Sequence, residues 1–121
     1  MSASFPRLNL VVIRSIDIER AAEFYNLLGL TVTRHAHGSG PIHYAAEGNG
    51  AVFEIYPASP KSAPTTGTRI GFAVAALDAL VEMLEKSGAT IVTPPANSEW
   101  GRRAVVKDLD GHTVELVEAG T

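Results

Sequence analysis

A histidine and a glutamate around one predicted hairpin are the first candidates for chemistry in this sequence. The residues Glu47–Gly50 read Glu-Gly-Asn-Gly, which is typical of a tight turn between antiparallel strands. A turn of those four residues places His43 opposite Glu54, with the Cβ atoms about 5 Å apart on one side of the hairpin. A histidine held by a carboxylate can act as a base or a metal ligand near neutral pH. The same pair could instead be a structural contact that stabilises the hairpin.

A second candidate group combines an aromatic residue with basic ones. Trp100, Arg102 and Arg103 lie in a predicted loop and the start of the strand that follows it. The indole could stack on a flat ligand beside Arg103, or it could seal the rim of a site or a subunit contact.

The other histidines carry weaker signals. His35 and His37 alternate at a predicted strand end, so their side chains lie on one side. No third donor is evident near them in the sequence, and we expect solvated histidines in a mobile loop. His112 follows Gly111, and we expect a turn residue at the start of a strand.

The elements that would position these residues occur twice in the same order. Residues 57–68 contain three prolines and are predicted to be a linker between unit one, about 6–56, and unit two, about 69–118. Ser15 and Asp17 are both candidate N-caps for the first helix. The predicted elements are a strand at 8–14, a helix carrying residues 18–28, strands at 30–34, 42–46 and 51–56, a strand at 69–74, a helix at 77–86, and strands at 89–93, 102–107 and 112–117.

The repeat is one of element order and not of residue identity. The predicted helix-stop glycines Gly29 and Gly88 lie 59 positions apart, and Glu54 and Glu115 lie 61 positions apart. One four-stranded sheet with one helix is too small to close a core, so the two units should combine. The sequence therefore predicts an α+β domain of two βαβββ units.

Six short runs carry a resemblance to a known family. They are Asp17–Tyr25 (DIERAAEFY), Leu28–Leu30 (LGL), Val52–Tyr56 (VFEIY), Ile70–Val74 (IGFAV), Trp100–Arg102 (WGR) and Asp108–Leu116 (DLDGHTVEL). Over nearly its whole length the chain resembles the vicinal oxygen chelate superfamily of glyoxalases, bleomycin resistance proteins and extradiol dioxygenases, which usually have proline at the position of Leu109. The resemblance implies paired βαβββ units that form an open, cup-shaped, antiparallel-rich sheet, often in a dimer. In the family's metal enzymes, four side chains from the cup hold a divalent ion that the substrate chelates.

The four metal-ligand positions that the resemblance implies fall on Leu10, Glu54, Arg69 and Glu115. Leucine cannot donate an electron pair, and a permanent cation such as arginine repels a metal. We therefore expect no metal at the full family set, although a divalent metal held by ligands from outside it, such as His43, stays open. Arg69 could clamp a carboxylate or enolate of a ligand, or pair internally with Glu54 or Glu115.

Composition excludes several classes of partner. The chain has 121 residues, 45% apolar and 19% charged, as in ordinary globular proteins. Its net charge of -3 argues against nucleic acid, and the lack of cysteine excludes disulfides and thiolate zinc sites. Met1–Leu8 has no sustained apolar run, so we expect neither a signal peptide nor a membrane span, and a cytoplasmic location.

Three functions follow from these residues. We expect a homodimer that binds a small organic ligand in the cup without a cofactor, through Arg69, Trp100, Arg103 and His43. The alternative is a lyase or isomerase of glyoxalase type with Glu54 or Glu115 as the base, and with His43 or Arg69 stabilising the oxyanion. Dioxygenase chemistry fits less well, because the sequence does not match the facial set of two histidines and one carboxylate that holds iron in such enzymes. A structural or regulatory module with a closed cup is the third possibility.

Overall fold

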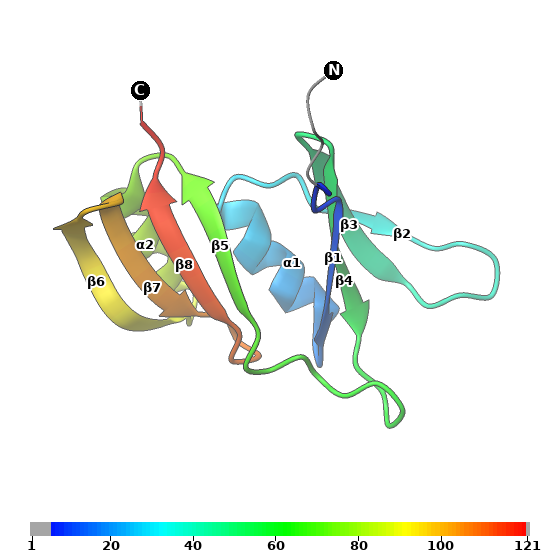
Figure 1. The fold of residues 1–121 in the computed structure, drawn as a ribbon. Helices are drawn as coiled ribbons and strands as arrows, with labels where there is room; N and C mark the ends of the chain where they lie inside the picture. Colours follow the sequence, from blue (N-terminus) through cyan, green and yellow to red (C-terminus); the bar gives the residue numbers. More distant parts are fainter. Residues whose placement is uncertain (1–5, 121) are drawn as a thin grey trace, which may run out of the picture.

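The structure, a computed structural model, describes residues 6–120 and contains the predicted order of elements twice (Figure 1). Residues 1–5, part of the segment in which we expect no signal peptide, lie outside the described residues. The elements are β1 (Leu10–Ser15), α1 (Ile18–Leu27), β2 (Thr33–His35), β3 (His43–Gly48), β4 (Ala51–Pro57), β5 (Arg69–Val74), α2 (Leu77–Lys86), β6 (Thr90–Ser98), β7 (Gly101–Lys107) and β8 (Thr113–Glu118).

Each unit forms its own four-stranded sheet. The strand orders are β1-β4-β3-β2 and β5-β8-β7-β6, which are the same arrangement in both units. In each sheet the first strand runs parallel to its neighbour, because a helix connects it to the rest, and the other pairs are antiparallel. The predicted α+β fold of two βαβββ units is confirmed.

Local sequence signals set where the helices begin and end. Of the two candidate N-caps of α1, Asp17 performs this role, because its carboxylate accepts a hydrogen bond from the backbone N–H of Arg20. Gly29 and Gly88 follow α1 and α2 with φ of 112° and 108°. Residues other than glycine rarely adopt such a positive φ.

Strand β6 is longer than predicted. The predicted strand ends at residue 93 and is followed by Pro94 and Pro95, which cannot donate ladder hydrogen bonds. The strand nevertheless continues to Ser98, with register shifts against β7 between Ile91 and Thr93 and between Thr93 and Ala96. Because β6 lies at the edge of its sheet, such irregularities and the two prolines are tolerated there.

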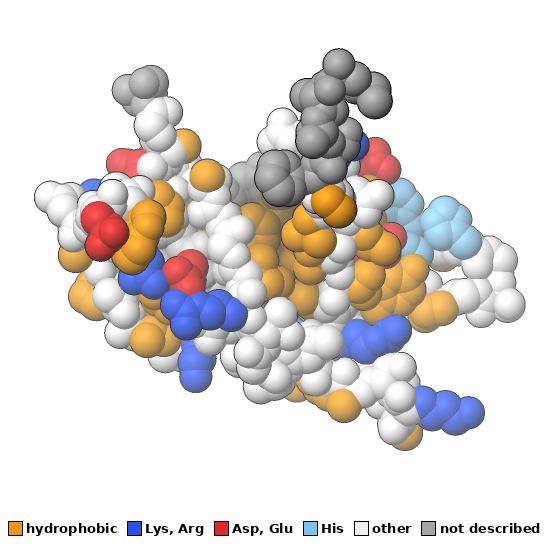
Figure 2. Space-filling model, in the orientation of Figure 1, with side chains coloured by type: hydrophobic (Ala, Val, Ile, Leu, Met, Phe, Trp, Pro, Cys, Tyr) orange, Lys and Arg blue, Asp and Glu red, His pale blue; other side chains and the backbone are white. Residues whose placement is uncertain are grey.

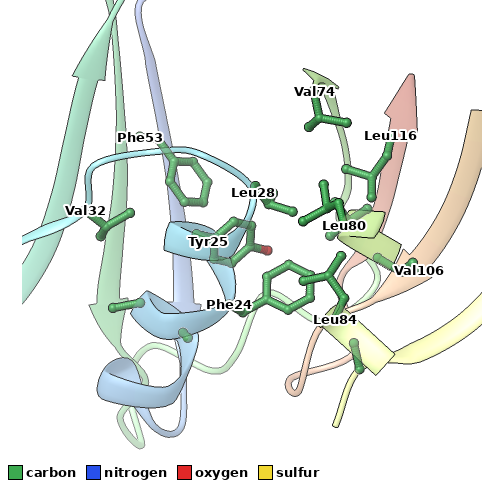
Figure 3. Packing of buried hydrophobic residues seen from close by; sticks show 14 of the residues in the cluster. Phe24, Tyr25, Leu28, Val32, Phe53, Val74, Leu80, Leu84, Val106 and Leu116 are labelled. Atoms are coloured by element: carbon green, nitrogen blue, oxygen red, sulfur yellow. The ribbon is translucent and has the colours of Figure 1, made fainter. Parts of the chain in front are cut away.

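The two units share one hydrophobic core, and helix α1 lies within it (Figure 3). The ring centre of Tyr25 lies 4.8 Å from that of Phe53 in unit one and 6.0 Å from that of Phe72 in unit two. Leu80 and Leu84 of α2 are buried in the same cluster. The face of each sheet that packs against its helix is therefore turned toward the shared core of the molecule. The other face of each sheet lies on the outside.

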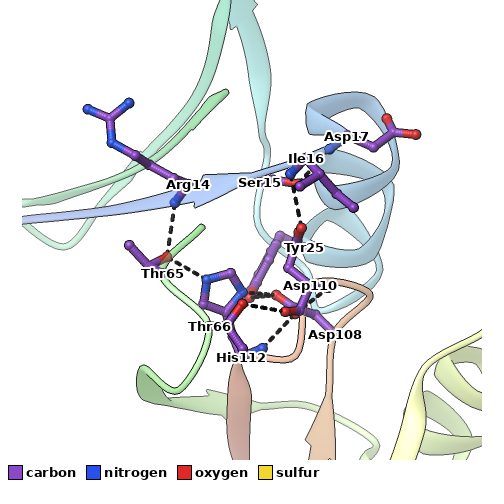
Figure 4. A network of polar contacts seen from close by, with 10 residues as sticks. All are labelled: Arg14, Ser15, Ile16, Asp17, Tyr25, Thr65, Thr66, Asp108, Asp110 and His112. Carbon is purple, nitrogen blue, oxygen red and sulfur yellow. Dashed lines mark hydrogen bonds and ion pairs between the residues drawn. The ribbon is translucent and has the colours of Figure 1, made fainter. Parts of the chain in front are cut away.

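A buried polar network joins the units and the linker (Figure 4). The Tyr25 hydroxyl donates to Oδ2 of Asp108 at 2.6 Å, and Nδ1 of His112 contacts the same oxygen at 2.8 Å. On the linker, the Thr65 hydroxyl contacts Nε2 of His112 at 2.6 Å and accepts from the backbone N–H of Arg14 at 3.0 Å. His112 is fully buried here and joins unit two to the linker. The prediction of a turn residue did not foresee this role.

The same network fixes the charge state of its acid. Burial alone would raise the pKa of the Asp108 carboxyl, but the hydrogen bonds from His112 and Tyr25 outweigh burial and hold that pKa below its usual range. Burial, followed by the negative charge of Asp108, raises the pKa of the Tyr25 phenol. Tyr25 therefore stays a hydrogen-bond donor at any physiological pH.

Candidate functional site

The candidate site residues lie on the two outer sheet faces. We call the outer side of the first sheet the unit-one face; strand register assigns it Leu10, Val12, Arg14, Thr33, His35, His43, Ala45, Glu47, Val52, Glu54 and Tyr56. The unit-two face is the outer side of the second sheet; its residues are Arg69, Gly71, Ala73, Arg103, Val105, Lys107, Thr113, Glu115 and Val117.

Glu54 lies in the middle of the unit-one face. Its strand neighbours are Val12 on one side and Ala45 on the other. In the described part of the chain it takes part in no ion pair. Leu10 occupies the adjacent position on β1, beside Val52, and is half exposed.

The predicted pairing of His43 with Glu54 is wrong by two residues. The β3–β4 turn consists of Asn49 and Gly50 alone, which adopt φ of 53° and 79°, as in a two-residue turn whose twist matches that of the strands. Ala45, and not His43, therefore lies opposite Glu54. A shift of two residues keeps His43 on the same face, and its ring stacks on Tyr56 with centres 4.4 Å apart and planes 5° apart.

A hollow on the unit-one face collects three histidines. It has a volume of ≈ 530 Å³ and is lined by Thr31, Thr33, His35, His37, His43, Ala45, Glu47, Val52 and Glu54. The β2–β3 register places His35 beside His43, with ring centres 5.8 Å apart, and His37 lies 5.8 Å and 5.5 Å from these two rings. The prediction that His35 and His37 have no third donor nearby is therefore wrong. The pairing of β2 with β3 across the intervening loop was the signal that could have revealed it.

The unit-two face holds an ion-pair cluster. Arg69 Nε donates to one carboxylate oxygen of Glu115, and Arg103 donates to the other at 2.8 Å. The Arg103 guanidinium, followed by that of Arg69, holds the pKa of the Glu115 carboxyl below its usual range. Of the two pairings considered for Arg69, the structure contains the one with Glu115 and not the one with Glu54.

Trp100 borders this cluster from the β6–β7 turn. Its side chain is 68% exposed and lines a hollow of ≈ 340 Å³ together with Arg69, Arg103, Glu115 and Val117. Arg102 instead forms a bidentate ion pair with Asp78 at the start of α2, in which its Nε and Nη2 donate to the two carboxylate oxygens at 2.7 and 2.9 Å. Arg102 and Arg103 are successive residues of β7, so their side chains point to opposite faces of the sheet and only Arg103 reaches the hollow.

The four positions at which the family's metal enzymes carry ligands do not suit a metal in this chain. Leu10 has no donor atom, Arg69 carries a fixed positive charge, and both oxygens of Glu115 are engaged by guanidinium groups. The four positions are also divided between the outer faces of two separate sheets, whose arrangement Figure 1 shows. Within one chain, Leu10 and Glu54 do not meet Arg69 and Glu115.

Neither helix in the described part of the chain has the length and apolar character needed to cross a bilayer.

Comparisons with known proteins agree with this architecture. Residues 7–116 match the family model of the Glyoxalase/Bleomycin resistance protein/Dioxygenase superfamily. An uncharacterized protein of Mycolicibacterium smegmatis is 30% identical over 106 residues, which are 87% of each chain. The antibiotic-binding protein TnmS3 of Streptomyces sp. CB03234 has a TM-score of 0.71 at 22% identity, with 98% of this chain and 100% of that chain covered. A glyoxalase-related enzyme of Fulvimarina pelagi has a TM-score of 0.71 at 20% identity, with 95% and 89% covered. At these identities the two solved structures show a shared fold.

Proposed function

Because this chain belongs to the Glyoxalase/Bleomycin resistance protein/Dioxygenase superfamily, we propose that it binds a small, flat organic anion in cups shared by two protomers. The observation that carries this proposal is the exposed Trp100 beside the Arg69–Glu115–Arg103 cluster. An indole offers a large flat surface for stacking, and exposed tryptophans of this kind are common in binding sites.

Charge at the unit-two face favours an anionic group on the ligand. Two guanidinium groups, on Arg69 and Arg103, face the single carboxylate of Glu115, which leaves one positive charge in excess. Arg69 uses its Nε on Glu115, and its side chain is 64% exposed, so its terminal nitrogens can reach a ligand. A planar guanidinium suits a carboxylate or an enolate, whose two oxygens it can bind at once.

A second protomer would complete each cup. The unit-one face exposes apolar side chains at Leu10 and Val12, which are 50% and 38% exposed, and a monomer gains nothing from leaving them in water. A twofold dimer that brings the unit-one face of one protomer over the unit-two face of its partner covers both faces twice. Each cup then contains Glu54 from one protomer and Arg69, Trp100 and Glu115 from the other.

One of the similar solved structures supports a binding role. TnmS3 is described as an antibiotic-binding protein, and its fold matches nearly all of this chain. We extend from it the binding of a small molecule, and no particular compound. The cytoplasmic location stays a prediction.

One observation favours an enzyme as the second candidate function. Glu54, in the middle of the unit-one face, and the more exposed Glu47 near the β3–β4 turn carry no ion pair among residues 6–120, whereas Glu115 is held by two arginines. A general base must be free to take up a proton, and the lowered pKa of Glu115 makes it a poor one. If the protein is a lyase or isomerase, Glu54 is therefore its base, and Glu54→Gln would abolish turnover while leaving ligand binding in place.

Fluorescence tests the binding proposal directly because Trp100 is the single tryptophan of the chain. We expect its emission to be quenched in a saturable way by those aromatic carboxylates or polycyclic antibiotics that the protein binds. Arg103→Gln and Arg69→Gln should weaken that binding about tenfold, whereas Arg102→Gln, which disrupts the ion pair with Asp78, should leave it unchanged. A quenching curve that is the same in all three variants would remove the cluster from the binding site.

A further inference from the structure

The three histidines of the unit-one hollow form a group that the proposed cup chemistry does not use. In Figure 2 the pale blue histidine side chains gather on one side of the molecule, in the region of β2 and the loop that follows it. The chain has four histidines, and the fourth, His112, is fully buried in the polar network between the units. The imidazoles that border the hollow are therefore those of His35 and His37, which are at least partly exposed, and of His43, which is buried but lines it.

Hydrogen bonds fix which nitrogen of two of these rings carries a lone pair. Nδ1–H of His43 donates to the carbonyl of Pro41 at 3.2 Å, which leaves Nε2 as the free acceptor. The Thr33 hydroxyl donates to the carbonyl of Ala45, so Nε2–H of His35 donates to that hydroxyl at 3.0 Å and Nδ1 is left free. Such bonds to the second ring nitrogen orient and activate the imidazoles that bind metals in proteins.

The centres of the three rings, although not yet their nitrogens, are spaced nearly as in a metal site. Their centres lie 5.5 to 5.8 Å apart. A tetrahedral zinc ion with Zn–N bonds of about 2.0–2.1 Å holds imidazole centres roughly 5 Å apart. The rings of His35 and His37 now stand nearly parallel, so they must turn about their side-chain bonds to converge. His37 is exposed and His35 is partly exposed, which allows this, whereas His43 is held by its stack on Tyr56.

The charge of the hollow also suits a cation. Its lining residues include Glu47 and Glu54 and no lysine or arginine among those described. The hollow therefore differs from the unit-two face, where two guanidinium groups occupy the carboxylate. Imidazole ligands select late first-row metals such as Zn²⁺, Ni²⁺ and Cu²⁺ over Mg²⁺ and Ca²⁺.

We propose that His35, His37 and His43 bind one divalent transition-metal ion per chain, with the fourth coordination position open to water or a ligand oxygen. This site lies on unit one alone and uses none of the four family positions. It does not depend on the proposed organic ligand, because the metal by itself is the probe.

The test is calorimetric titration of ZnCl₂ and NiCl₂ into the chelator-treated, tag-free protein. We expect one ion per chain, and His35→Ala and His37→Ala should each weaken binding more than tenfold, because each removes one of three ligands. Ser39→Ala, in the same loop, and Glu115→Gln, at a family position, should bind like the unmodified protein. Because His43 is buried, its replacement by glutamine is interpreted only with a circular dichroism spectrum that shows a folded protein.

Two outcomes would overturn the proposal. The first is metal binding that survives both histidine replacements but is lost in Glu54→Gln or Glu115→Gln, which would place the ion at the family positions. The second is weak binding of several ions with no dependence on any single histidine. The electron paramagnetic resonance spectrum of the Cu²⁺ form gives a separate reading, because coordinated imidazole nitrogens split its signal and the splitting should change in His37→Ala.

Discussion

Asp108 accepts hydrogen bonds from Tyr25, His112 and Asp110, and it shows how single residues hold the two units together. The side chains of Asp108 and His112 are almost fully buried, and Asp110 is partly buried. A buried carboxylate is tolerated only when its oxygens are satisfied in this way. The stability of the shared core should therefore respond sharply to changes at these few atoms.

Removal of one hydroxyl tests this network. Tyr25→Phe keeps the ring between Phe53 and Phe72 but deletes the donor to Asp108. We expect a loss of about 2 kcal/mol in the free energy of unfolding, because hydrogen bonds to charged groups contribute about 1.5–3 kcal/mol. Urea denaturation measures the change. Tyr44→Phe, whose hydroxyl has no hydrogen bond among the described residues, is the matched control and should change little.

The lowered pKa of Asp108 predicts a pH dependence of stability. Because the folded-state pKa lies below the unfolded one, the carboxylate stabilises the fold above the unfolded value of about 3.9, and this contribution is lost as pH falls through the folded value. Thermal unfolding followed from pH 6 to pH 2 should show this loss at the acid end. Asp108→Asn should be less stable at pH 6 and should depend less on pH. Equal slopes in both proteins would mean that other carboxyl groups dominate acid unfolding.

At the scale of elements, the tight β3–β4 turn sets the register of the unit-one face. Asn49 and Gly50 both adopt positive φ, and the register they fix places Ala45 opposite Glu54. Gly50 also lies against Arg7, whose Cζ is 3.2 Å from the position that a Cβ would occupy. Both facts make this glycine difficult to replace.

The turn predicts unequal effects of two neighbouring substitutions. Gly50→Ala should destabilise the protein by about 1–2 kcal/mol, because it forces a side chain into a left-handed conformation. Gly48→Ala, two residues earlier, has no positive φ and open space around its Cβ position, and should be nearly neutral. Denaturant midpoints of the two variants measure the difference. Equal midpoints would show that the turn relaxes without cost.

Sequence patterns predicted most of the elements because local signals determine them. Helix α2 and strand β5 have the predicted bounds, since apolar spacing and Gly88 determine where the helix lies and ends. Features that depend on distant contacts were missed: the histidine group requires the β2–β3 pairing, and the burial of His112 requires Tyr25 and the linker. The two-residue error at His43 arose because Glu47–Gly50 also fits a longer turn.

At the scale of the whole molecule, each of the two outer faces supplies part of the proposed binding site. Unit one supplies Glu54 with exposed Leu10 and Val12, and unit two supplies Trp100 with the arginine cluster. The shared core turns these faces in different directions, as Figure 1 shows for the sheets that carry them. A second copy is the partner that would complete both.

The proposed assembly makes a prediction about mass in solution. Sedimentation equilibrium at micromolar concentrations should give a dimer, because a specific interface that covers both faces buries on the order of 1,200–2,000 Å² or more. Val12→Arg, on the unit-one face, should weaken this dimer or the ligand binding within it. Purely monomeric behaviour up to high concentration would contradict the shared cup.

Mixing two defective variants tests the central claim most directly. Val12→Arg damages the unit-one face and keeps Trp100, whereas Trp100→Leu damages the unit-two face and keeps Val12. After subunit exchange, a mixed dimer contains one cup with both faces intact, and that cup contains the remaining tryptophan. We predict ligand-dependent quenching of Trp100 in the mixture and none in either variant alone. A mixture that shows no quenching, although both variants are folded and dimeric, would contradict a cup built from two protomers.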